Sequence, residues 1–123
     1  MSAKRILIAD DDRGAVLLIR HLLEMQDYEV EEASQGSEVL RRVSDSSFDL
    51  ILLDFNMRDI KGDRICFMLR MDPKYKDLPI MIVTAHIERE ERIFKDYGAT
   101  DVIYKPLDSE EFIQKVKKCL KEK

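Results

Sequence analysis

Five polar side chains in this sequence directly follow apolar runs, where a fold could bring them together. Asp10 and Asp11 follow ILIA, Asp54 follows ILL, Thr84 follows IMIV and Lys105 follows DVIY. Clustered carboxylates repel one another by about 4 kcal/mol per pair at 4 Å with an effective dielectric near 20, and one lysine does not neutralise three of them. Carboxylate oxygens suit Mg²⁺. A metal, a lysine, a hydroxyl and an accessible carboxylate together are suited to binding a phosphoryl group.

The apolar runs have the length of strands, and helical patterns separate them. We expect strands at 5–10, 28–33, 48–54, 78–85 and 101–105, of which 28–33 alternates as a strand with one partly exposed face does. Apolar residues at helical spacing predict helices over about 15–22 and 39–43, after Gly62, over 88–97, and in a last segment capped by Asp108. This alternation predicts an α/β fold, a doubly wound five-stranded parallel sheet with five helices on both faces.

The predicted sheet explains why the polar residues stand at strand ends. In an open parallel sheet the carboxyl ends of all strands lie along one edge, where ligands bind. The five residues are therefore expected to share one site, although they are remote in sequence. Asp12, the third acid of the run, is better placed to cap the first helix.

These motifs, in this order, resemble those of the response-regulator receiver domain, the phosphoacceptor module of two-component signalling. The resemblance covers residues 5 to about 121 and rests on the acidic pair at 10–11, ILLD ending at 54, TA at 84–85 and KP at 105–106. It implies the flavodoxin-like strand order 2-1-3-4-5. It also implies that Asp54 is the phosphorylation site, and that Asp10, Asp11, Asp54 and the backbone carbonyl of Asn56 hold Mg²⁺, for which Mn²⁺ could substitute.

By the same resemblance, Thr84, Ala85 and Lys105 would contact the phosphoryl group. The donor would be a histidine kinase or a histidine phosphotransfer protein, and the output would pass to a downstream protein or to an effector domain outside this sequence. The chain would then be a signalling module rather than an enzyme.

The sequence departs from the family pattern at three positions. Arg58 stands where receivers commonly carry a proline, and Lys61 stands where an acid is common; both are interpreted as solvated loop charges. Val102 replaces the usual Tyr or Phe that turns inward on activation. Tyr104 lies on the same strand face by alternation and is the candidate substitute, and His86 is expected at the rim of the site.

Composition sets the remaining expectations. With 123 residues, 45% of them hydrophobic and 37% charged, the chain is expected to form one domain over 1–123. The net charge of −4 argues against direct contact with nucleic acid. No apolar run has the length of a membrane span, so we predict a cytoplasmic protein without membrane contact. Cys66 and Cys119 are expected to be buried hydrophobes.

Three alternatives stay open at this point. DFN at 54–56 is similar to the nucleophile segment of haloacid-dehalogenase-like phosphatases, but these place it after the first strand and need a second Asp where Asn56 stands. A flavodoxin-like mononucleotide binder needs a Gly/Ser/Thr-rich loop after the first strand, and ADDDRG would repel a phosphate. A degenerate receiver that acts only through protein interaction would have no need of Asp54, Thr84 and Lys105.

Overall fold

The computed structural model describes residues 3–85 and 91–122, and this part of the chain forms five parallel strands and five α-helices. The sheet has the order β2-β1-β3-β4-β5, as predicted. Its strands are β1 (Arg5–Ala9), β2 (Glu29–Ala33), β3 (Leu50–Asp54), β4 (Ile80–Thr84) and β5 (Asp101–Tyr104).

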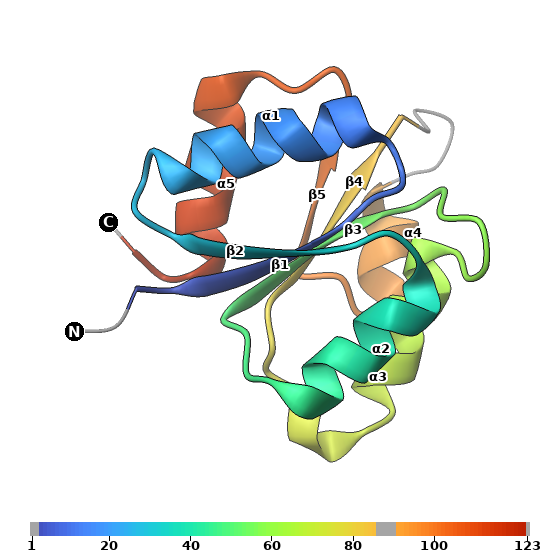
Figure 1. Ribbon diagram of the computed structural model, residues 1–123. Coiled ribbons are helices and arrows are strands. Elements are labelled where there is room, and N and C mark those ends of the chain that lie inside the picture. The colour runs from blue at the N-terminus through green and yellow to red at the C-terminus, as the bar shows by residue number, and fades with distance from the viewer. Residues whose placement is uncertain (1–2, 86–90, 123) are drawn as a thin grey trace.

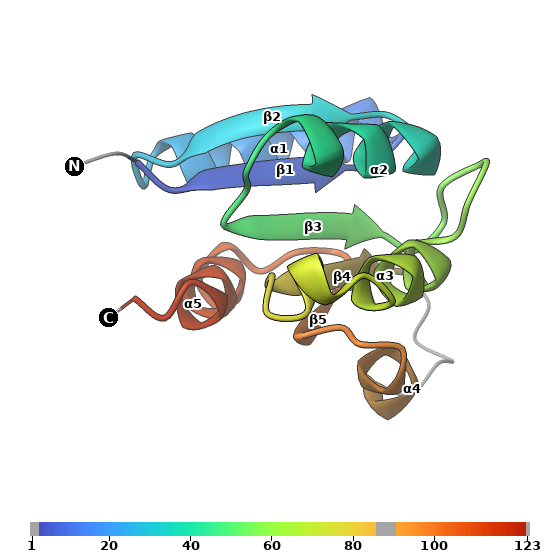
Figure 2. The ribbon, with the colours of Figure 1, turned by 90° about the horizontal axis from the view of Figure 1, so that it is seen from below.

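The helices cover both faces of the sheet. Figures 1 and 2 show α1 and α5 on one face and α2, α3 and α4 on the other. Their bounds are α1 (Arg13–Glu24), α2 (Gly36–Asp45), α3 (Gly62–Arg70), α4 (Glu91–Asp96) and α5 (Ser109–Cys119), with a short 3₁₀ helix at Pro73–Tyr75 before β4.

Each face of the sheet carries its own apolar core, because side chains alternate along every strand. Ile51 and Leu53 of β3 pack with α2, α3 and α4, whereas Leu50 and Leu52 pack with α1 and α5. The inner strands β1, β3 and β4 therefore read as mainly apolar runs, as is typical of parallel strands buried on both sides. Phe48 and Leu78 are partly buried against the core but lie outside the strands. Their apolar character extended the predicted strands, and β3 and β4 begin two residues later than the predicted bounds 48 and 78.

Side chains fix the helix ends that the sequence suggested. The Asp12 carboxylate accepts hydrogen bonds from the N–H groups of Gly14 at 3.0 Å and Ala15 at 3.4 Å, which caps α1. Asp108 caps α5 in the same way. The predicted helix over 88–97 is described from Glu91, and His86 lies outside the described residues.

The connection from α4 to β5 is tied to α3 by one arginine. Arg70 donates to the carbonyl oxygens of Gly98 at 3.0 Å and Tyr75 at 2.6 Å, and to the hydroxyl of Thr100 at 3.4 Å. Gly98 has a φ of 107°, and a Cβ there would lie 2.5 Å from the Arg70 side chain. Position 98 therefore requires glycine for two reasons, the positive φ and the close approach of the Arg70 side chain.

The border strand β2 carries a network of ion pairs. Glu31 contacts Arg5 and Arg42, and Glu32 contacts Arg13 and Arg20. Nowhere in residues 3–85 and 91–122 is there a helix long and apolar enough to cross a membrane.

Candidate functional site

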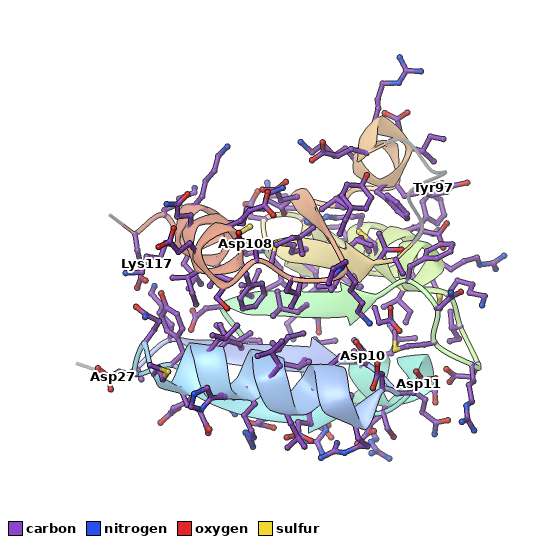
Figure 3. All side chains as sticks on the ribbon, turned by 90° about the horizontal axis from the view of Figure 1, so that it is seen from above. Asp10, Asp11, Asp27, Tyr97, Asp108 and Lys117 are labelled. Atoms are coloured by element: carbon purple, nitrogen blue, oxygen red, sulfur yellow. The ribbon has the colours of Figure 1, made fainter. Side chains whose placement is uncertain are left out.

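Three carboxylates gather where β1 and β3 end. One ligand oxygen from each of Asp10, Asp11 and Asp54 lies within 4.8 Å of the other two, an arrangement that could hold a metal ion. Figure 3 shows Asp10 and Asp11 side by side beyond the end of β1. Asp10 and Asp54 are 2% and 6% exposed, whereas the Asp11 side chain is 28% exposed. The cluster is thus buried at its base and open to solvent at Asp11.

Lys105, at the end of β5, supplies positive charge to the base of this cluster. Its ammonium nitrogen lies 3.0 Å from Asp10 Oδ2 and 3.7 Å from Asp54 Oδ1. Burial alone would lower the pKa of Lys105, but the hydrogen bond to Asp10 and the charge of Asp54 outweigh it, so the pKa is raised. The lysine therefore stays charged at neutral pH and contacts two of the three acids.

Burial and the neighbouring charge of Asp10 raise the pKa of Asp54 from 3.8 to about 6, although Lys105 opposes the shift. The carboxylates thus repel one another more than the lysine compensates. A hard dication with oxygen ligands would relieve this repulsion, and the donor set fits Mg²⁺ because all three side-chain ligands are carboxylates.

Thr84 and Tyr104 stand beside each other at the ends of β4 and β5. They are register partners in the parallel ladder, and Thr84 is fully buried. Val102, two residues before Tyr104, is also fully buried, and both side chains pack against the core on the α2–α3–α4 face. The expectation that Tyr104 shares a face with Val102 is therefore confirmed. Ala85 follows Thr84 and is exposed.

The loop between β3 and α3, residues 55–61, carries two cations, of which Arg58 contacts an acid of the site. Arg58 is 90% exposed, in keeping with a solvated charge, but its Nε also lies 3.6 Å from Asp11 Oδ2. Lys61 donates to the side-chain oxygen of Asn56 at 3.1 Å. Both residues are exposed loop charges, as predicted. The contact of Arg58 with Asp11 was not predicted, because neighbours along the chain do not reveal which way a long side chain reaches.

Gly62 is a further site-building residue that sequence reasoning missed. A Cβ at this position would lie 2.6 Å from the backbone oxygen of Asp54, and the Gly62 N–H donates to the carbonyl of Phe55 at 2.9 Å. The glycine lets α3 begin directly against the end of β3. The DFNMRDIKG segment contains the glycine, but the close approach becomes visible only once α3 is placed.

The comparisons with known proteins agree with this fold and site. The sequence model of the response regulator receiver domain matches residues 6–117, and the chain belongs to this family. It is therefore a receiver domain of two-component signalling. Receiver domains bind Mg²⁺ at an acidic cluster, and the cluster of this chain is Asp10, Asp11 and Asp54.

Individual relatives are similar over nearly the whole chain. The response regulator ArlR of Staphylococcus saprophyticus is 33% identical over 118 residues, which are 95% of this chain and 52% of ArlR. The chain spans about half the length of the first curated relatives it matches.

Solved structures give the same result. A CheY-like receiver domain protein from Methanospirillum hungatei has a TM-score of 0.89 and 30% identity, with 98% of this chain and 95% of that chain covered. The response regulator TrrA of Thermotoga maritima, in complex with Mg²⁺ and BeF, has a TM-score of 0.86 and 30% identity, with 94% and 98% covered.

Proposed function

We propose that Asp54 is the phosphoacceptor of this receiver domain and that it takes its phosphoryl group from a phosphohistidine of a histidine kinase or a phosphotransfer protein. The observation that carries the proposal is the position of Asp54, nearly buried at the end of the central strand, with Lys105 and two further acids around it. With a pKa of about 6, the Asp54 carboxyl is mostly ionised at pH 7, as a nucleophile must be.

In the proposed step, one Asp54 carboxylate oxygen attacks the phosphorus atom. The P–N bond of the phosphohistidine breaks, its electron pair goes to the departing imidazole, and an acyl phosphate remains on Asp54. Lys105 and the hydroxyl of Thr84 would hold phosphoryl oxygens, with the backbone around Ala85 close by.

Asp10, Asp11 and the carbonyl of Asn56 would hold Mg²⁺ together with Asp54, and Mn²⁺ could take its place. When bound, the ion supplies positive charge to the phosphoryl oxygens in the transition state. Neither the phosphatase nor the mononucleotide alternative is favoured by the family match over 6–117.

A direct test is to incubate the protein with Mg²⁺ and acetyl phosphate and to measure its intact mass. The wild type should gain one phosphoryl group, mapped to Asp54 as an acyl phosphate, and Asp54→Asn should gain none. Asp77→Asn is a matched control, because Asp77 is an exposed acid in the turn before β4. Equal labelling of Asp54→Asn and the wild type would refute the assignment.

We further propose that the conformational response differs from the usual aromatic swing. Val102 is fully buried and β-branched, so it has neither the size nor the χ1 freedom for a rotation that could signal the phosphorylated state. Tyr104 is the register partner of Thr84. A shift of Thr84 toward the phosphoryl group would therefore change the packing around the Tyr104 ring first. The response would then reach α4 and the face formed by β5 and α5.

Structures with and without beryllofluoride would decide between two modes of action. A changed backbone after Thr84 or a changed Tyr104 rotamer would support the switch. Identical backbones from 84 to 97 and an unchanged Tyr104 would indicate a phosphoryl carrier in a relay. In either case the −4 charge of the sequence favours a protein partner or an attached effector over direct nucleic-acid contact.

A further inference from the structure

Two different cations contact the acids of the site, and they contact different ones. Lys105 lies within 4 Å of Asp10 and Asp54, the two buried carboxylates. Arg58 lies 3.6 Å from Asp11, the most exposed of the three. Lys105 directly follows β5, on the far side of β4, whereas Arg58 comes from the loop that directly follows Asp54.

The two contacts also differ in how easily they break. Lys105 is 22% exposed and its carboxylate partners are almost fully buried, so these ion pairs are largely shielded from solvent. Arg58 is 90% exposed, and an ion pair of this kind is weak and readily exchanged.

Asp11 is the carboxylate at which a dication can enter the site from solvent. Asp11 is both the open acid of the cluster and the acid that Arg58 contacts. A cation that approaches Asp11 meets the charge of the guanidinium and must displace it from the carboxylate. Because the pair is exposed, displacement is feasible but opposes binding.

We propose that Arg58 competes with Mg²⁺ for Asp11 and so lowers the affinity of the site for the ion. The inference rests on the proposed function, since it takes Asp11 as a metal ligand. Arg58 is then a positioning residue that sets the Mg²⁺ concentration at which the site fills. For a unit charge and a dication about 6 Å apart in water, Coulomb's law gives up to about a tenfold effect on the dissociation constant. Partial withdrawal of the exposed side chain reduces this to about threefold.

The experiment is a Mg²⁺ titration of the full chain without a phosphodonor, followed by amide NMR shifts and by calorimetry. Arg58→Gln removes the charge and Arg58→Lys keeps it. Lys117→Gln is the control for net charge, because it removes one positive charge from α5 at the end of the molecule opposite Asp10 and Asp11 (Figure 3). Arg58→Gln should bind Mg²⁺ about three- to tenfold more tightly than the wild type, while the other two variants stay close to the wild type.

Two other outcomes are distinguishable, one that refutes the competition by Arg58 alone and one that refutes the metal site as well. If Arg58→Gln binds Mg²⁺ no more tightly than the wild type, or if Lys117→Gln gains as much, the competition is refuted and the metal site stands. If the wild type shows no Mg²⁺ response at Asp10, Asp11 and Asp54, the metal site fails and the competition fails with it.

Discussion

Replacing Asp54 by asparagine should make the metal-free protein more stable at neutral pH. The Asp54 carboxylate is 6% exposed and faces Asp10, with Lys105 as the nearby cation and Asp11 completing the cluster. Its pKa is raised to about 6 by burial and by the charge of Asp10. The folded state therefore disfavours the ionised form, and an uncharged amide of nearly the same shape removes that cost while Lys105 keeps its contact with Asp10.

The size of the effect follows from the pKa. A rise from 3.8 to about 6, at about 1.4 kcal/mol for each pKa unit, corresponds to up to about 3 kcal/mol. Below about pH 3 the carboxyl is mostly protonated in both the folded and the unfolded state, so the cost is nearly absent. As the pH rises from about 3 to 6, the unfolded state ionises first and the wild type loses stability. The advantage of Asp54→Asn should thus grow through this window and be constant above about pH 6.5.

Urea unfolding in EDTA, monitored by circular dichroism at pH 4.5 and at pH 7, measures this difference, with Asp77→Asn as the exposed-acid control. Added Mg²⁺ should reverse the order, because a ligand that binds only the folded wild type stabilises it by mass action. A free energy of unfolding that is equal for Asp54→Asn and the wild type at pH 7 would refute the reasoning. So would an advantage of the same size at both pH values.

Three further predictions concern single side chains. Asp11→Ala should bind Mg²⁺ at least tenfold more weakly in an NMR titration, because a ligand and its charge are removed; unchanged affinity would reduce the acid pair to a solvated turn. Lys105→Ala should still be phosphorylated by acetyl phosphate but should show smaller amide shifts in β5 and α4, and a full wild-type response would exclude the lysine from the switch. Arg70→Met should lower the free energy of unfolding by about 1–3 kcal/mol, since three acceptors lose their donor; urea titration measures this, and a loss below 0.5 kcal/mol would show that water replaces the arginine.

The convergence of Asp10, Asp11, Asp54 and Lys105 was predictable because a parallel sheet leaves little freedom. The three apolar runs that precede these residues end at one edge of the sheet, whatever the details of the loops. The helix caps at Asp12 and Asp108 were predictable for a similar reason, since an acid before an amphipathic helix has a local partner. The chemical roles assigned to the site residues remain predictions.

The contacts of Arg58, Lys61 and Gly62 could not be predicted from the sequence pattern. The direction of a long arginine or lysine side chain depends on the backbone path of its loop, and no periodicity encodes that path. The importance of Gly62 depends on a contact between backbone atoms of two elements, which exists only after α3 has packed beside β3. Arg70 is a similar case, because its three acceptors lie five to thirty residues away in sequence.

The glutamates of β2 have a consequence for self-association. A strand at the border of a sheet offers unpaired backbone groups to any other strand, and this is how folded proteins begin to aggregate. If two copies of this chain met through β2, Glu31 and Glu32 of one copy would come up against the same acids of the other, and like charges beside each other oppose pairing. High salt screens the repulsion between the acids of two copies, so the tendency of this protein to form strand-paired aggregates should rise with ionic strength.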